Sequence, residues 1–389
     1  SSNGLEKRPK LRFLGFDDPW KVFKAEELFQ NITDRNHPDE TVLTIIQGKG
    51  TLPREQAGRN IHYDDASLSN YKKVEQGDFI IHLRSFEGGL EMANEAGIVS
   101  PAYTILRCKR PHSSLFYDAY FHTDEFINHN LSKSVEGIRD GRQISYEAFK
   151  WLGIPYCEPT EQEKISTLFS AFNERIAKQR DLVESLKKYK RGVNNQILSQ
   201  IDNSYNCRLG SVCEIVGGGT PDTLHAEYWG NTVEWFTPSE IGKTKYVNNS
   251  VRKLSDIGLD NSSAKLLPIG TVLLTTRATL GEMSIAKREC STNQGFQSLI
   301  PHTDRVSSEY LYYMQIIIKP WCEKYASGNT FREISKSALS DCIIPIPDRA
   351  RQEQIVKLLS SIDMIIDAAE SISMSLSKIR HGLMQQLFI

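Results

Sequence analysis

The chain repeats itself at a fixed offset of 190 residues, and this repeat limits its possible folds more than any other feature. The segment Arg142–Ser145 (RQIS) returns as Arg332–Ser335 (REIS). No gap is needed through the rest of the chain, so the two copies must share one backbone there. The inserts at 5–141 and 207–331 resemble each other far less. Two copies of one backbone segment that carry different inserts predict one task performed on two different targets.

The length and the repeat divide the chain into four segments. With 389 residues, it is long enough for two to three domains that each have a core. Short β-rich runs, turn clusters and a helical patch occur in both inserts, which predicts an α+β fold class. Ser1–Gly4 are interpreted as an expression remnant. The expected segments are a globular domain at 1–153, a long helix at 154–199, a second globular domain at 200–343 and a second long helix at 344–389.

Two helices of about 40 residues are predicted from apolar residues that alternate at spacings of four and three. The first helix is expected from Thr160 and the second lies one repeat later. Eight of ten such positions are apolar in each copy, which indicates a coiled-coil seam. The predicted seam residues are Ile165, Phe169, Phe172, Ile176, Val183, Leu186, Val193 and Ile197 in the first copy, and Ile355, Leu359, Ile362, Ile366, Leu376, Leu383 and Leu387 in the second, where Ala369 is the eighth apolar position.

The order of the segments predicts how the helices pair. The first helix must carry the chain from the first globular domain to the second, and the second helix starts from the second domain. If the seams pair, the helices are antiparallel, and the globular domains lie at opposite ends of a rod with approximate two-fold symmetry. Forty residues span about 60 Å at 1.5 Å per residue.

A second apolar stripe runs beside the seam at sevenfold spacing. A two-stranded coil does not require this third row, so it must cover something else. It either packs on the chain's own globular domains or serves as a docking face for helices of another subunit. The stripe consists of Leu358, Ile365, Ile372 and Ile379 in the second copy, with Leu168, Leu182 and Tyr189 in the first.

Composition excludes several classes of protein. Hydrophobic content of 39% and charged content of 24% are those of a globular protein, and no apolar run is long enough for a membrane span. The 7 cysteines are scattered without a C-x-x-C pair, which favours reduced thiols in the cytoplasm. The net charge of −1 is unusual for a protein that binds nucleic acid alone. A DNA-binding role would therefore need the positive surface of a partner.

The sequence lacks the patterns of the common catalytic sites. Gly242-Lys243-Thr244 resembles the end of a phosphate-binding loop, but Thr237 stands where that loop needs glycine. The histidines never fall at the spacing of metal ligands, and no nucleophile or nuclease carboxylate cluster is present. We therefore expect no catalytic residue, no metal and no cofactor in this chain.

Several motifs of the second insert resemble the target recognition domain of type I restriction–modification specificity subunits. The first insert carries a divergent form of it, in Arg84–Gly89 and Gly97–Tyr103. The resemblance extends over essentially the whole chain as recognition domain, long helix, recognition domain, long helix. The motifs are Gly217–Pro221 (GGGTP), Glu227–Gly230 (EYWG), Val233–Ile241 (VEWFTPSEI), Thr276–Gly281 (TRATLG) and Thr292–Phe296 (TNQGF).

This resemblance implies a reader of DNA sequence without catalytic activity. Members of the family recruit two adenine-N6 methyltransferase subunits and, in the full complex, two ATP-dependent motor-endonuclease subunits. S-adenosylmethionine, ATP and Mg²⁺ would then be used by those partners, which would also supply phosphate contacts to double-stranded DNA. The main alternative is a coiled-coil scaffold with two ligand-binding heads and no role on DNA.

Two different globular domains (the heads) at the ends of one coiled coil (the spacer) should read two different half-sites. We therefore expect a bipartite, asymmetric DNA site with an unread gap whose length is set by the coiled coil. A spacer longer by one heptad would separate the heads by about 10.5 Å more. That distance corresponds to about 3 base pairs at 3.4 Å each.

Candidate DNA contacts are chosen by side-chain chemistry and by position in Gly-containing loops. Arginine pairs well with the O6 and N7 atoms of guanine, and asparagine or glutamine with N6 and N7 of adenine. Arg142 and Arg332 recur in both copies, so they are expected to be structural or to contact phosphate. For each candidate the alternative is a solvated or purely structural side chain. The candidates are Lys49, Arg54, Arg84, Ser100, Arg142, Thr237, Ser239, Arg277, Asn293, Gln294 and Arg332.

Overall fold

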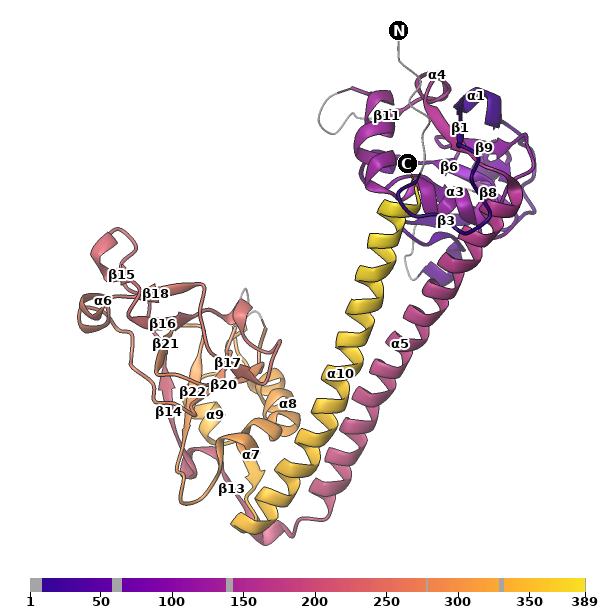
Figure 1. Cartoon of the computed structure of the whole chain (residues 1–389). Helices are drawn as coiled ribbons and strands as arrows, with labels where there is room; N and C mark the ends of the chain where they lie inside the picture. Colours follow the sequence, from indigo (N-terminus) through magenta and orange to yellow (C-terminus); the bar gives the residue numbers. More distant parts are fainter. Residues whose placement is uncertain (1–8, 58–64, 138–142, 278, 329–331, 389) are drawn as a thin grey trace. The chain divides into compact units, whose positions relative to one another are not determined.

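The computed structural model describes residues 9–57, 65–137, 143–277, 279–328 and 332–388. The chain divides into two compact units (Figure 1). Unit 1 comprises Ser1–Arg180 and Glu370–Ile389, and unit 2 comprises Asp181–Ala369. Two long helices, α5 (Pro159–Ser199) and α10 (Arg349–Leu387), contribute to both units. In the described part of the chain, no helix combines the length and hydropathy that a membrane span requires.

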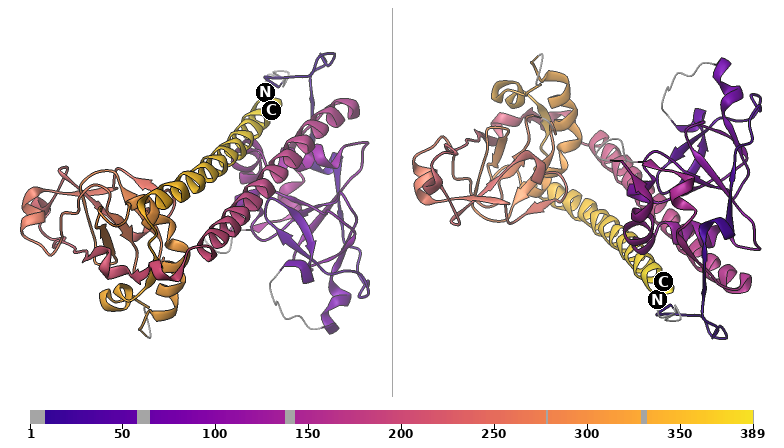
Figure 2. Two further views of the ribbon diagram at one scale, coloured as in Figure 1. Left: turned by 90° about the horizontal axis from the view of Figure 1, so that it is seen from below. Right: turned by 90° about the horizontal axis from the view of Figure 1, so that it is seen from above.

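Unit 1 is built on short antiparallel strands (Figures 1 and 2). Its largest sheet has the order β2-β9-β6-β7, and two-stranded sheets β1-β12, β3-β4, β5-β8 and β10-β11 surround it. The elements are β1 (Lys21–Lys24), α1 (Ala25–Leu28), β2 (Phe29–Ile32), β3 (Leu43–Ile46), β4 (Gly50–Pro53), β5 (Lys72–Val74), β6 (Phe79–Ile81), α2 (Ser85–Gly88), β7 (Glu91–Met92), β8 (Gly97–Val99), β9 (Thr104–Cys108), α3 (Ser114–Phe121), β10 (Val135–Glu136), β11 (Gln143–Ile144), α4 (Tyr146–Phe149) and β12 (Gly153–Tyr156).

The core of unit 1 is mainly aromatic. Phe29 and Phe79 from the central sheet pack against Phe121 of α3, with ring centroids 4.9–5.9 Å apart. The end of α10 closes this core, because Phe388 packs against Phe116 at 5.2 Å and stacks on Phe169 of α5 at 5.9 Å. Such aromatic contacts contribute beyond their buried area. The last turn of the second long helix is therefore part of the first globular core.

Unit 2 contains two larger sheets (Figures 1 and 2). The five-stranded sheet has the order β14-β22-β19-β20-β17, the four-stranded sheet has the order β15-β18-β16-β21, and the pairs β16-β21 and β17-β20 are parallel. The elements are β13 (Asn206–Arg208), β14 (Cys213–Gly217), β15 (Trp229–Gly230), β16 (Val233–Phe236), β17 (Tyr246–Val247), β18 (Arg252–Leu254), α6 (Asp256–Asp260), β19 (Val272–Leu274), β20 (Met283–Ala286), β21 (Cys290–Thr292), β22 (Gln297–Pro301), α7 (Ser308–Tyr313), α8 (Gln315–Tyr325), α9 (Lys336–Ser340) and β23 (Ile343–Pro345).

The sequence repeat corresponds to the same local structure in each unit. Ser145 and Ser335 both cap a short helix, each accepting a backbone N–H bond of 3.1 Å. Gln162 and Gln352 are buried at the start of the long helices. Each side chain donates to a carbonyl five residues earlier (2.8 and 2.9 Å) and accepts a backbone N–H from its own globular domain (3.0 and 3.2 Å). These buried glutamines therefore fix each long helix to its domain.

The long helices pair in opposite directions. In unit 1 the end of α10 meets the start of α5, where Phe388 contacts Phe169. In unit 2 the second half of α5 meets the first half of α10, where Lys190 forms an ion pair of 2.5 Å with Asp363. Every predicted seam residue is buried or half-buried. The α+β class and the antiparallel coiled coil are therefore confirmed.

The helices begin later than the segment boundaries at residues 154 and 344. Residues 154 and 344 lie instead in strands β12 and β23, which pair antiparallel with β1 and β13. Pro155 and Pro345 favour this extended backbone because proline lacks the N–H that a helix interior uses. Helix α5 starts at Pro159, one residue before Thr160, where proline suits a first helical position.

Candidate nucleic-acid interface

Four motifs of unit 2 that are distant in sequence meet at one set of loops. Gly219 N–H donates to Thr292 O (2.9 Å), and Asn293 N–H donates to Phe236 O (3.1 Å). Thr276 N–H donates to Gly295 O (2.8 Å). These bonds join the GGGTP, VEWFTPSEI, TRATLG and TNQGF segments. We call this arrangement the loop cluster, with the polar side chains Thr220, Thr237, Ser239, Arg277, Asn293 and Gln294.

Glycine is required where the segments of the loop cluster touch. A Cβ atom on Gly218 would lie 1.9 Å from the carbonyl oxygen of Asn293. A Cβ on Gly295 would lie 2.9 Å from Cγ of Pro238. Since any larger residue would push these segments apart, the glycines of both motifs serve close backbone approach.

Several predicted contacts of the loop cluster have local structural partners. Asn293 Oδ1 accepts the N–H of Gly295 at 2.9 Å, which closes a turn. Thr237 caps the short 3₁₀ helix Pro238–Glu240, and its hydroxyl donates to Glu240 at 2.7 Å. Ser239 and Gln294 are exposed, and Gln294 accepts a hydrogen bond from Thr220. The exposed pair is therefore better placed for a ligand than Thr237 or Asn293.

The predicted arginines of unit 2 are all engaged within the protein. Arg277 forms an ion pair of 3.0 Å with Glu333, and both side chains remain partly exposed. Because an exposed pair contributes little stability, Arg277 can exchange this partner at small cost. Arg332 donates to the carbonyls of Glu323 and Ala326 at the end of α8. That arrangement favours a structural role for Arg332, whereas Arg142 lies outside the described residues.

Two candidates of unit 1 lie at the tip of the β3–β4 hairpin and just before α2, and the other two follow β4 and β8. Lys49 is exposed at the hairpin tip. Arg84 precedes α2 and pairs with Glu87 at 3.0 Å. The Arg54 guanidinium lies 5.9 Å from the ring centroid of Tyr71. Ser100 accepts a hydrogen bond from Ala102 N–H at 3.4 Å.

The hairpin tip with Lys49 and the end of α2 belong to one local arrangement. A Cβ on Gly88 would lie 1.9 Å from the amide nitrogen of Gln47, so the hairpin tip touches α2. The fully buried Glu91 carboxylate accepts the N–H groups of Gly48 (2.6 Å) and Gly50 (2.8 Å). The backbone on both sides of Lys49 is therefore fixed by one carboxylate.

His122 completes this arrangement, with Nε2 3.4 Å from Glu91. Burial alone would lower the pKa of His122, but the hydrogen bond to Glu91 and the charge of Asp118 raise it to about 9. Burial opposes ionisation of Glu91, yet His122 and the two backbone N–H groups lower its pKa. The pair is therefore ionised at neutral pH and anchors the hairpin electrostatically.

Comparison with known proteins identifies the second half of the chain. Residues 202–376 match the family described as type I restriction modification DNA specificity domain. We call residues 202–376 the specificity domain, after the family that they match. All four segments of the loop cluster lie inside this domain.

Two relatives of the chain are specificity subunits of type I restriction enzymes. The chain is 34% identical over 186 residues to the type I restriction enzyme MjaIX specificity subunit of Methanocaldococcus jannaschii. This aligned stretch covers 47% of this chain and 43% of that protein. It is 24% identical over 259 residues to the EcoR124I/EcoR124II specificity subunit of Escherichia coli, covering 62% of this chain and 63% of that protein. The chain thus spans less than two thirds of either relative.

Solved structures resemble the fold over a greater length. A chain from a study of type I restriction–modification complex assembly matches with a TM-score of 0.60 and 19% identity, covering 95% of this chain and 97% of that chain. The type I restriction–modification S subunit from M. genitalium matches with a TM-score of 0.54 and 15% identity, covering 98% and 99%. At these identities the likeness establishes the fold alone.

We predict that the hairpin carrying Lys49 loosens as the pH rises. The pKa of His122 is raised from 6.5 to about 9, so its contribution to stability is complete below about pH 6.5 and is lost as the pH rises through 9. Full loss corresponds to about 3 kcal/mol. The protection of the Gly48 and Gly50 amides against hydrogen exchange, corrected for intrinsic rates, should fall over this range. The variant His122→Gln should show a flat profile, and a flat wild-type profile would contradict the assignment.

Sequence reasoning missed the acidic residues that hold the specificity domain's loops. The buried Glu234 and the half-buried Glu240 bind backbone N–H groups of the turn between β17 and β18. Both lie in the VEWFTPSEI motif, where we considered only the hydroxyl side chains as contacts. The available signal was a carboxylate at the third position after Thr237, which is the spacing of a capping box.

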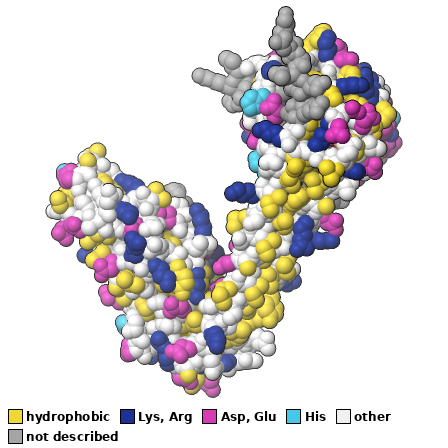
Figure 3. Space-filling model, viewed as in Figure 1, with side chains coloured by type: hydrophobic (Ala, Val, Ile, Leu, Met, Phe, Trp, Pro, Cys, Tyr) yellow, Lys and Arg dark blue, Asp and Glu magenta, His cyan; other side chains and the backbone are white. Residues whose placement is uncertain are grey.

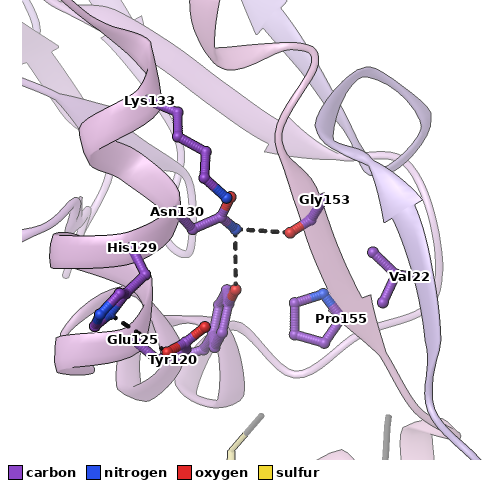
Figure 4. Close-up of a pocket in the computed structure, with 8 residues that line it drawn as sticks. All are labelled: Val22, Tyr120, Glu125, His129, Asn130, Lys133, Gly153 and Pro155. Carbon is purple, nitrogen blue, oxygen red and sulfur yellow. Dashed lines mark hydrogen bonds and ion pairs between the residues drawn. The ribbon is translucent and has the colours of Figure 1, made fainter. Parts of the chain in front are cut away.

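A small cavity in unit 1 is separate from these candidates. It has a volume of about 150 Å³ and is lined by eight residues, none of which is a predicted DNA contact (Figure 4). Asn130 donates to Gly153 O (2.7 Å) and to the Tyr120 hydroxyl (3.3 Å) across it. Within the described residues, no group of three or more His, Cys, Asp or Glu side chains is arranged to hold a metal ion.

Proposed function

We propose that the chain is the non-catalytic sequence-specificity subunit of a type I restriction–modification complex and acts in the cytoplasm. The match of residues 202–376 to the DNA specificity domain carries this proposal. Unit 1 supports it, because its long helix is anchored by the same buried glutamine and its short helix by the same serine cap. In this role each unit presents one set of loops to DNA.

The two units should read different half-sites of an asymmetric, bipartite sequence. The loop cluster of unit 2 offers Ser239, Gln294 and Arg277 at its surface. Unit 1 offers Lys49 and Arg84 instead, on a hairpin and a helix start of different structure. Each set contains one arginine, but the other side chains and the backbone settings differ, so we expect the two units to read different bases.

Two adenine-N6 methyltransferase subunits should dock along the long helices. Four aliphatic residues at sevenfold spacing on α10 remain about half exposed, although the seam beside them is buried. Hydrophobic side chains gather along the long helices on the face shown in Figure 3. An apolar row of this kind fits the apolar face of a partner helix. Methylation with S-adenosylmethionine, and ATP-dependent cleavage by two motor-endonuclease subunits where present, would belong to the partners. The row consists of Leu358, Ile365, Ile372 and Ile379.

Mapping N6-methyladenine in host DNA tests the proposed function. We expect a split motif with two unlike halves that disappears when the gene for this chain is deleted and returns when the intact chain is supplied. If the methylation map is the same with and without the chain, the proposal fails. A coiled-coil scaffold without a role on DNA would then be favoured, particularly if the chain does not co-purify with a methyltransferase.

A further inference from the structure

A turn at the edge of unit 2 exposes an unusual set of side chains. Residues 248–251 connect β17 to β18, and Val251 is 86% exposed at the end of this turn. Asn248 and Asn249 are exposed beside it. In the described part of the chain neither asparagine amide has an intramolecular partner. The turn therefore presents one aliphatic group and two free amides to its surroundings.

The backbone of this turn is held firmly. The buried Glu234 carboxylate accepts both the N–H (2.6 Å) and the hydroxyl (2.8 Å) of Ser250. The Ser250 hydroxyl oxygen also accepts the N–H of Trp235 at 2.9 Å. Lys253 balances the charge of Glu234 at 2.7 Å. Because charge-assisted bonds to a buried carboxylate are strong, the turn is fixed before any ligand arrives.

A second carboxylate joins the turn to the loop cluster. One oxygen of Glu240 accepts the N–H of Val251 at 2.8 Å. Its other oxygen accepts the N–H (2.8 Å) and the hydroxyl (2.7 Å) of Thr237. Val251 is therefore placed next to the segment that carries Ser239. The turn and the loop cluster form one continuous surface of the specificity domain.

The exposed groups match the edge of an A·T base pair. In the major groove thymine presents a 5-methyl group, which apolar side chains contact, and adenine presents N6 and N7, which asparagine can bind together. An aliphatic side chain that is held in water does not gain the free energy of burial. Contact with an apolar group of a ligand would remove part of its surface from water and stabilise the complex. Of the groups that DNA exposes in the major groove, the thymine methyl is the one that fits Val251.

We propose that the Asn248–Val251 turn reads an A·T base pair, with Val251 against the 5-methyl group of thymine and the asparagine amides directed to adenine. This inference rests on the proposed function, because it assumes that unit 2 faces DNA. It adds a base reader to the candidates that were predicted from the sequence.

The test removes one methyl group from the DNA at a time. Each thymine of the recognised sequence is replaced by deoxyuridine, which lacks only the 5-methyl group, and binding of the complex of this chain with its methyltransferase is measured. For the wild type we expect one position at which affinity falls about fourfold, the value for one buried methylene-sized group. The Val251→Ala variant should bind thymine-containing DNA about fourfold more weakly and lose its sensitivity at that position alone.

A matched control is available in unit 1. Val22, in β1, is also an exposed valine, and Val22→Ala should keep the wild-type response to every replacement. If Val251→Ala responds like the wild type at all positions, the turn does not read thymine and the inference is overturned. It is equally overturned if Val251→Ala weakens the methyltransferase contact but leaves the replacement profile unchanged. A wild type that prefers no DNA sequence would instead contradict the proposed function itself.

Discussion

Replacing Phe388 with alanine should lower the free energy of unfolding of unit 1 by about 3–5 kcal/mol, the range for a buried phenylalanine. Phe388 is buried against Trp20, Phe116, Tyr120 and Phe169, with ring centroids 5.2–6.3 Å apart. Removing its ring would leave a cavity at the centre of these contacts. Hydrogen exchange of α3, which supplies two of these aromatic residues, measures the effect directly in unit 1.

Met374→Ala is the matched control for this prediction. Met374 lies on α10, the helix that leads to Phe388, and within unit 1, but its side chain is largely exposed. Its replacement should change stability by no more than about 0.5 kcal/mol. Equal effects of the two substitutions would show that the end of α10 does not hold the core of unit 1 together.

Lengthening both long helices by one heptad should widen the unread gap of the DNA site by about 3 base pairs. The insertions belong after Arg180 in α5 and after Ala369 in α10, where the chain passes between the two units. An insertion of seven residues preserves the apolar seam, because the seam repeats every seven residues, and lengthens each helix by about 10.5 Å. The methylated sequence in cells that carry the lengthened chain reports the new gap.

The control for the lengthened chain carries the heptad in only one helix. It shifts one seam against the other, so the Lys190–Asp363 pair of unit 2 and the Phe169–Phe388 contact of unit 1 can no longer both form. We expect it to lose methylation rather than to move the gap. An unchanged gap in the doubly lengthened chain would mean that the spacer does not set the distance between half-sites.

The long helices could be predicted because their signal is local and repeated. A seam such as Ile355, Leu359 and Ile362 is visible in consecutive turns, and the same positions prove to be buried. The short strands carry little such signal. Strand β17 has two residues and acquires its place only by pairing with β20 about forty residues later. Strand order in both units therefore depended on contacts that no local pattern encodes.

The candidate site was predictable as a set of loops but not as individual contacts. Glycine-rich motifs marked the segments that meet around Gly218 and Gly295, because close backbone approach demands glycine. The sequence could not indicate that Arg332 caps the end of α8, or that Asn293 closes its own turn. Nor could it reveal the fixed turn at Val251, since its rigidity comes from carboxylates at positions 234 and 240.

The place of Phe388 in the core of unit 1 also bears on how the chain is made. Residues 20–169 leave the ribosome long before the end of α10, yet Met384, Leu387 and Phe388 complete the apolar cluster that these earlier residues begin. The first unit therefore emerges with an uncovered aromatic surface and matures only after residues 384–388 have been synthesised. During that interval the uncovered apolar surface is exposed to aggregation and to chaperone binding.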